Sequence, residues 1–213
     1  MIPGIPSTYC GPSVAAAMPG PSGPSIRAVL QNGQTGGNAP TLPTHATGDT
    51  LVFGFWGSMA PLAGTGWTRQ IAQDDSGLTS TLAVYTKQAA SSSESNPFSI
   101  NPTGDYLYAG ASVQNPATGY DVSASGNGTG TNIIAPTITT TASNDVLLSF
   151  YGAGTNASIV VVPAPQANGT NVQQTGKRLA RGTETLSASG ATGTRTATCA
   201  TSSDWCAANV AVK

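Results

Sequence analysis

Few side chains in this sequence have the chemistry of acids, bases, nucleophiles or metal ligands. The 213 residues include one histidine, His45, and nine Asp and Glu residues. A Ser-His-Asp triad uses histidine as its base, but no Gly-x-Ser-x-Gly motif accompanies His45, which lies in a turn-like stretch. We therefore interpret His45 as a surface or loop residue rather than as a catalytic base.

The carboxylates are dispersed, and most of them lie in or beside predicted turns. Two carboxylates facing a cleft would indicate a glycosidase, and clustered oxygen ligands would indicate calcium. Asp74 and Asp75 precede Ser76-Gly77, but their spacing matches no EF-hand loop, so we interpret them as caps of local backbone amides. The sequence predicts no catalytic residue, no metal and no cofactor. A glycoside hydrolase or lyase is kept only as a third function class.

Cys199 and Cys206 flank Ser202-Ser203, where the sequence predicts a two-residue turn. In such a hairpin the two cysteines would face each other with Cβ atoms about 4.5–5.5 Å apart, slightly wider than a relaxed disulfide. They would then form either a cross-strand disulfide or two buried free thiols. The lack of a secretion signal favours the free thiols. With one distant histidine, they do not form a zinc site.

Three of the eight basic residues, Lys177, Arg178 and Arg181, lie within five positions. The run Gly-Lys-Arg-x-x-Arg lacks the Walker pattern. It indicates one of two things: a site for an acidic partner or a phosphate, or a solvated strand edge whose charge prevents aggregation.

Charge is scarce along the whole chain. Only 8% of the residues are charged, compared with about a quarter in an average soluble protein. The formal net charge of −1 provides no basic field for nucleic acid and no polybasic patch for a membrane. No apolar run approaches the roughly 20 residues of a membrane helix, and the N-terminus does not resemble a secretory signal. We expect cytoplasmic synthesis, no nucleic-acid or membrane partner, and a role in binding or assembly.

The residues between these groups have the pattern of β-structure. Short apolar runs alternate with Gly, Asn, Pro and Ser clusters, and no segment keeps helical spacing over three turns. One-sided alternation predicts antiparallel sheets packed face to face. Asn-Gly pairs at residues 32–33, 127–128 and 168–169 predict tight turns. The predicted strands are residues 26–31, 49–56, 67–72, 80–89, 106–114, 133–141, 145–151, 158–162, 172–175, 178–187, 194–200 and 205–212.

The chain divides into two parts. Residues 1–25 contain six prolines with glycines between them, which disfavours regular structure. They are either a disordered terminus or an extended arm that crosses a neighbouring subunit. Residues 26–213 have the length of one β domain.

A faint internal repeat relates the two halves of this domain. Residues 48–53, Gly-Asp-Thr-Leu-Val-Phe, resemble residues 144–149, Asn-Asp-Val-Leu-Leu-Ser. Either the halves are pseudo-symmetric, or both use a common combination of a turn, an Asp and a buried strand.

Several short motifs follow one another along the chain. They are Gly-Asp-x-Leu in residues 48–53, Gly-Trp-Thr in 66–68, Tyr-x-Lys-x-Ala in 82–89, and a closing Thr/Ala-rich segment followed by Trp and small apolar residues in 196–208. Their order resembles a recurrent β-sandwich module of bacteriophage virion proteins. The resemblance covers roughly residues 26–213 and brings no catalytic residues with it. The proline-rich arm departs from the module.

The resemblance implies a jelly-roll-like β-sandwich. Together with the strand pattern and the proline-rich N-terminus, we expect an all-β, antiparallel, jelly-roll-like sandwich with an extended N-terminal arm. The implied function is capsid decoration or cementing, on the capsid surface of a virion, after synthesis in the host cytoplasm. The partners would be the major capsid protein and further copies of this chain, for which a homotrimer is one arrangement. The alternative is a carbohydrate- or receptor-binding module of a tail fibre or a bacterial surface protein, with a glycan as its partner.

Overall fold

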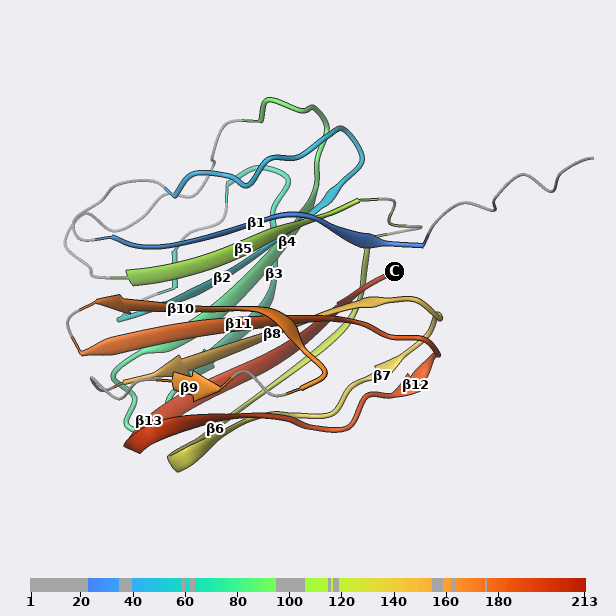
Figure 1. Cartoon of the computed structure of the whole chain (residues 1–213). Coiled ribbons are helices and arrows are strands. Elements are labelled where there is room, and N and C mark those ends of the chain that lie inside the picture. The colour runs from blue at the N-terminus through green and yellow to red at the C-terminus, as the bar shows by residue number, and fades with distance from the viewer. Residues whose placement is uncertain are drawn as a thin grey trace, which may run out of the picture.

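Two fully buried strands, β2 (Thr50–Gly57) and β8 (Val146–Ala153), form the centre of the fold. Their β-branched and aromatic residues favour extended backbone, and burial on both faces explains their nearly continuous apolar runs. The computed structural model describes residues 23–34, 40–58, 60–61, 64–94, 106–114, 116, 119–154, 159–161, 164–174 and 176–213. In it, each central strand lies in the middle of an antiparallel sheet (Figure 1).

The first sheet has the strand order β1-β5-β2-β4-β3 and the second has the order β10-β11-β8-β13-β6, with β9 also paired to β13. The remaining strands of the first sheet are β1 (Ser25–Gln34), β3 (Thr68–Asp74), β4 (Thr81–Gln88) and β5 (Tyr106–Gln114). Those of the second sheet are β6 (Tyr120–Ala135), β9 (Ile159–Val161), β10 (Ala167–Gln174), β11 (Lys177–Thr185) and β13 (Arg195–Val212). The short strands β7 (Thr139–Thr140) and β12 (Gly190–Ala191) pair with each other.

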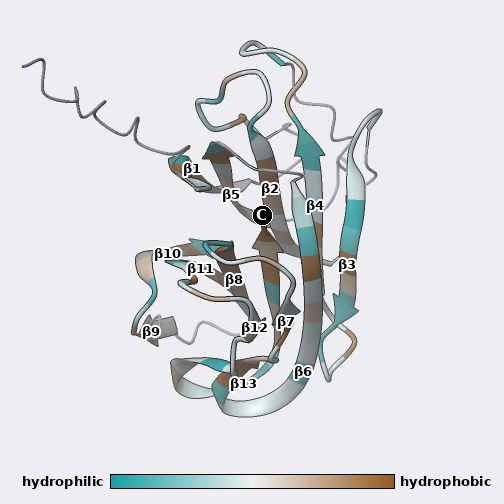
Figure 2. Ribbon diagram, turned by 90° about the vertical axis from the view of Figure 1, so that its right-hand side faces the viewer, coloured by the Kyte–Doolittle hydropathy of each residue, from teal (hydrophilic) through white to brown (hydrophobic). Residues whose placement is uncertain are grey.

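The prediction of an all-β antiparallel sandwich is confirmed, because the two sheets pack against each other and the described residues contain no helix. Figure 2 shows hydrophobic residues along the central strands β2, β5 and β8, and more polar ones along β3 and β6. The core between the sheets includes Val52, Trp56, Val84, Leu148 and Phe150. Phe53 and Phe55, on the other face of β2, are buried in a second cluster with four further aromatic rings, those of Trp67, Tyr85, Tyr106 and Tyr108.

The internal repeat extends over the two halves of the chain. Taken in chain order, β1 to β5 of the first half correspond to β6, β8, β10, β11 and β13 of the second half, and both sheets then have the same strand order. The strands β2 and β8 also begin alike, since Gly48 and Asn144 before them both have positive φ, of 87° and 63°. Successive strands therefore stay in one sheet, a simpler connectivity than that of a jelly roll, in which they alternate between sheets.

The sheets meet through reciprocal contacts between equivalent positions. The ladders place Thr50 opposite Gln88 and Val146 opposite Thr185, so the residues of β2 and β8 correspond with an offset of 96. A Cβ added to Gly54 would lie 2.6 Å from Cε1 of its equivalent, Phe150. A Cβ added to Gly152 would lie 2.6 Å from Cε3 of its equivalent, Trp56. Such mutual contacts are typical of a twofold interface, here formed within one chain.

Three predicted Asn-Gly turns are wrong, because residues 32–33, 127–128 and 168–169 lie inside β1, β6 and β10. The first strand begins at Ser25, one residue before the predicted start of the domain at residue 26, and Ser25 pairs with Gln114. Residues 1–22, which include Cys10 and most of the predicted arm, lie outside the described residues.

Candidate functional site

The predicted facing of Cys199 and Cys206 is wrong. Residues 195–212 form one continuous strand, β13, so the two cysteines lie along the same strand and not across a hairpin. The expected turn at Ser202-Ser203 is instead a bulge, where the pairing with β6 jumps from Thr198 to Ser203. Both thiols are free and buried, Cys206 between the sheets and Cys199 in a separate cluster.

The basic run does not form one surface patch. Its members lie on β11, where alternate residues point to opposite faces of the sheet. Lys177 Nζ donates to Ser58 Oγ at 3.2 Å, and Arg178 is half-buried. Arg181 is fully buried, and its Nη1 donates to the carbonyl of Gly110 in the other sheet at 2.5 Å. Burial lowers the pKa of Arg181 to about 10. Arg181 is therefore a core residue, which removes it from any surface site formed with Lys177 and Arg178.

His45 and Asp75 form hydrogen-bond contacts with residues close to them in the sequence. His45 Nδ1 lies 2.7 Å from the carbonyl oxygen of Pro43. Asp75 accepts hydrogen bonds from the amide and the hydroxyl of Thr79, at 2.8 and 2.9 Å, which is the turn cap that the sequence predicts. In the described part of the chain, no three His, Cys, Asp or Glu side chains come together in an arrangement that could hold a metal ion.

Two buried carboxyl groups, Asp121 and Asp145, lie together at one end of the sandwich. Asp121 accepts hydrogen bonds from the Thr141 hydroxyl at 2.6 Å and from Lys213 Nζ at 2.9 Å. Burial, together with hydrogen bonding to Asp121 and its negative charge, raises the pKa of Asp145 to about 6. Burial acts in the same direction on Asp121, but hydrogen bonds from Thr141 and Lys213 bring the pKa of Asp121 down to about 2. Between about pH 2 and pH 6, therefore, Asp145 is the protonated partner of an ionised Asp121.

This pair predicts a pH-dependent effect of Asp145→Asn. Because folding raises the pKa of Asp145 from 3.8 to about 6, its stabilising contribution is complete below pH 3.8 and is lost as the pH rises through 6. An amide at this position carries no charge to lose. We expect Asp145→Asn to match the wild type at pH 4 and to exceed its stability by about 2–3 kcal/mol at pH 8. Thermal denaturation at both pH values measures the difference, and a difference independent of pH would contradict the pairing.

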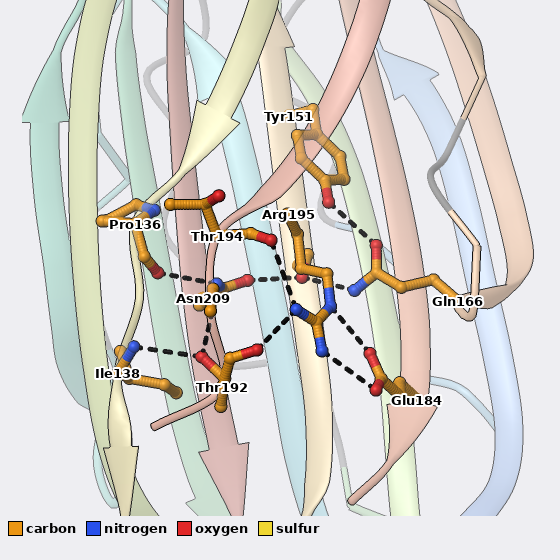
Figure 3. Close-up of polar contacts among 11 residues, drawn as sticks. Pro136, Ile138, Tyr151, Gln166, Glu184, Thr192, Thr194, Arg195 and Asn209 are labelled. Atoms are coloured by element: carbon orange, nitrogen blue, oxygen red, sulfur yellow. Dashed lines mark hydrogen bonds and ion pairs between the residues drawn. The ribbon is translucent and has the colours of Figure 1, made fainter. Parts of the chain in front are cut away.

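A polar network covers the outer face of the second sheet (Figure 3). The Ser149 hydroxyl donates to Asn209 Oδ1 and accepts a hydrogen bond from Gln166 Nε2 at 2.6 Å, while Gln166 Oε1 accepts one from the Tyr151 hydroxyl at 2.8 Å. Beside it, Arg195 forms a bidentate ion pair with Glu184, at 2.9 and 3.0 Å.

The hydrogen bonds of this network attach neighbouring segments of the chain to the second sheet. Arg195 also donates to the carbonyls of Thr192 and Thr194, and Asn209 Nδ2 donates to the carbonyl of Pro136 at 2.7 Å. These bonds hold the segments around residues 136, 166 and 192 against the sheet. The carboxylate in the network, Glu184, is fixed by its ion pair with Arg195.

Two pockets open at the end of the sandwich where β2 and β8 begin. The first, of about 200 Å³, is lined by Thr50, Gly66, Thr68, Gln70, Thr86, Lys87, Gln88, Gly119 and Tyr120. The second, of about 370 Å³, is lined by Ile26, Val146, Pro165, Ala167, Thr183, Glu184 and Thr185. The sequence contains no motif for either pocket. The one signal for their relation is the repeat, which aligns Thr50 with Val146.

The described residues contain no helix with the length and hydropathy of a membrane span. Comparisons of the chain with known protein families, with curated proteins and with solved structures found no match.

Proposed function

We propose that this chain is a non-enzymatic structural protein of a bacteriophage virion, which docks on the capsid surface and decorates or cements the shell. Its partners would be the major capsid protein and neighbouring copies of itself. The proposal rests on the resemblance of the motif order to phage virion modules and on one observation of the structure, which is how the charged side chains are used.

Most of the basic side chains are either paired with carboxylates of the same chain or buried. Four of the eight basic residues form ion pairs with carboxylates of the same chain, namely Arg27 with Asp49, Lys87 with Glu94, Arg195 with Glu184 and Lys213 with Asp121. A fifth, Arg181, is buried. The surface left for a partner consists mainly of neutral Thr, Ser, Asn, Gln and Gly residues. Such a surface binds by shape and hydrogen bonds rather than by electrostatic attraction, which suits a permanent position on a large assembly.

The proposal predicts capsid binding that depends weakly on salt. The protein should sediment with capsids of the phage that carries its gene, and the bound fraction should change less than about twofold between 50 and 500 mM NaCl, because few exposed charges are left to screen. Failure to sediment with these capsids would refute the capsid proposal. Binding that collapses in 500 mM NaCl would refute its neutral contacts.

A chain lacking residues 1–22 is the matched variant for this measurement. The truncation removes no described residue and keeps Gly23, where an added Cβ would lie 3.0 Å from the Cβ of Asn144. If the proline-rich segment is an arm that crosses a neighbouring subunit, the truncated chain should keep its thermal transition and bind capsids at least about tenfold more weakly. Unchanged binding would exclude the arm from the contact.

A further inference from the structure

The two pockets at one end of the sandwich occupy equivalent places in the two halves of the chain. Thr50, Thr86 and Gln88 in the smaller pocket correspond in register to Val146, Thr183 and Thr185 in the larger one. Likewise, Tyr120, opposite Val212, corresponds to Ile26, opposite Val113. The fold therefore provides its own comparison: one site built twice, with different side chains.

The smaller pocket contains a buried hydroxyl that the protein leaves available. Thr50 is 2% exposed, and its Oγ1 has no hydrogen-bond partner among the described residues. A buried hydroxyl without a partner destabilises a folded protein. Val146, at the equivalent place, demonstrates that the fold accepts an apolar side chain of the same shape there. The hydroxyl of Thr50 is thus not required by the packing at this position.

Two glycines keep this pocket open, one beside the Thr50 hydroxyl and one beside Lys87. Gly119 has a φ of 86°, and a Cβ added to it would lie 3.3 Å from Thr50 Oγ1. Gly66 has a φ of 83°, and a Cβ added to it would lie 3.2 Å from Lys87 Cε. A side chain at either position would narrow the pocket.

The wall of the smaller pocket is neutral and rich in groups that both donate and accept hydrogen bonds. Its one cation, Lys87, is neutralised by an ion pair with Glu94 at 2.5 Å. The other polar side chains are hydroxyls and amides, among them Thr68, Gln70 and Tyr120. Hydroxyl groups of a ligand match such a wall, because a hydroxyl donates one hydrogen bond and accepts two. The volume of about 200 Å³ is below the roughly 300 Å³ of the smallest drug-sized pockets, so it suits a single ring.

We propose that the pocket around Thr50 binds one neutral sugar ring, either as a free monosaccharide or as the terminal residue of a glycan. The larger pocket does not share this site, because Ile26, Val146, Pro165 and Ala167 give it an apolar wall. This inference goes beyond capsid docking and does not depend on it.

The test is a titration of the full ¹⁵N-labelled chain, followed by NMR, with glucose, galactose, mannose and N-acetylglucosamine and with their methyl α-glycosides. We expect shifts of the Gly66 and Gly119 amides with at least one sugar, at millimolar affinity. Binding of the glycosides assigns the end of a glycan, and binding of free sugars alone assigns a monosaccharide. If none of these probes shifts these amides, the inference is overturned.

Thr50→Val is the decisive variant because it installs the side chain of the equivalent position. It should weaken binding at least about tenfold, the effect of one lost hydrogen bond, and raise the melting temperature, since a buried hydroxyl without a partner is removed. Thr185→Val, in the larger pocket, is the matched control and should bind as the wild type does. Equal binding by Thr50→Val and the wild type would overturn the inference even if a sugar binds elsewhere.

Discussion

Gly54→Phe is expected to leave the chain without a cooperative thermal transition. Gly54 lies in the central strand β2, and even a single added carbon would be 2.6 Å from Cε1 of Phe150 across the sandwich. The introduced Phe ring and the ring of Phe150 would share a core without space toward the solvent, since Phe150 and Trp56 are both 0% exposed. A second ring therefore has to separate the sheets, and overpacking on this scale exceeds the 1–3 kcal/mol typical of one added methylene by a wide margin. Circular dichroism and differential scanning calorimetry measure the loss.

The pseudo-twofold relation predicts how this defect can be repaired. Because Gly54 and Phe150 are equivalent positions, Gly54→Phe combined with Phe150→Gly places one ring in the same space from the opposite sheet. The double variant should regain a cooperative transition, and Phe150→Gly alone should lose about 4 kcal/mol to the cavity. Gly126→Ala is the control, since a Cβ there meets only Ile134 O at 3.8 Å and Pro136 Cδ at 3.9 Å. A double variant no more stable than Gly54→Phe would contradict the symmetric packing.

The strands that the sequence reveals are those whose own residues decide their burial. The apolar runs of β2, β4, β5 and β8 predict these strands to within a residue or two at most ends, because nearly every residue in them is buried. Most of the strand Tyr120–Ala135, residues 120–132, shows no such signal, since it consists largely of Gly, Ser, Thr and Asn. It forms a strand because β13 pairs along its whole length, which is a tertiary cause that no local pattern contains.

Gly128 illustrates why the turn predictions fail. An Asn-Gly pair usually marks a tight turn, but a Cβ on Gly128 would lie 2.7 Å from Cζ2 of Trp205 on the paired strand. The glycine is required by a ring that is distant in the sequence, and not by the backbone angle of a turn. The same holds for the Cys199 and Cys206 prediction, which depended on a turn at Ser202-Ser203 that the long pairing of β13 with β6 replaces.

The candidate sites divide in the same way. The scarcity of catalytic side chains can be predicted from the composition alone, because counting residue types requires no knowledge of contacts. The pocket around Thr50 is not, because it brings together residues of β2, β3, β4 and β6, and an unpartnered hydroxyl is a property of the folded chain alone. The internal repeat was the one sequence feature that pointed to it, through the exchange of Thr50 for Val146.

Arg181→Ala is expected to destabilise the fold by about 3 kcal/mol, which lowers the melting temperature by roughly 6–12 °C. In the first half of the chain the equivalent residue is Val84, which is 0% exposed in the core. Arg181 thus fills an inward position with its long aliphatic stem, while its guanidinium donates to the carbonyl of Gly110. Truncation removes both the packing of the stem and the hydrogen bond between the sheets.

Lys177→Ala is the matched control, since Lys177 lies on the same strand and its hydrogen bond to Ser58 is exposed. It should change the stability by less than about 0.5 kcal/mol. The pair of variants separates the two roles that the basic run allows, because a docking residue affects capsid binding and leaves the melting temperature unchanged, whereas a core residue lowers the melting temperature. An unchanged melting temperature in Arg181→Ala would place the guanidinium outside the core and leave it available to a partner. A large loss confined to Arg181→Ala would leave docking to the neutral faces of the sandwich.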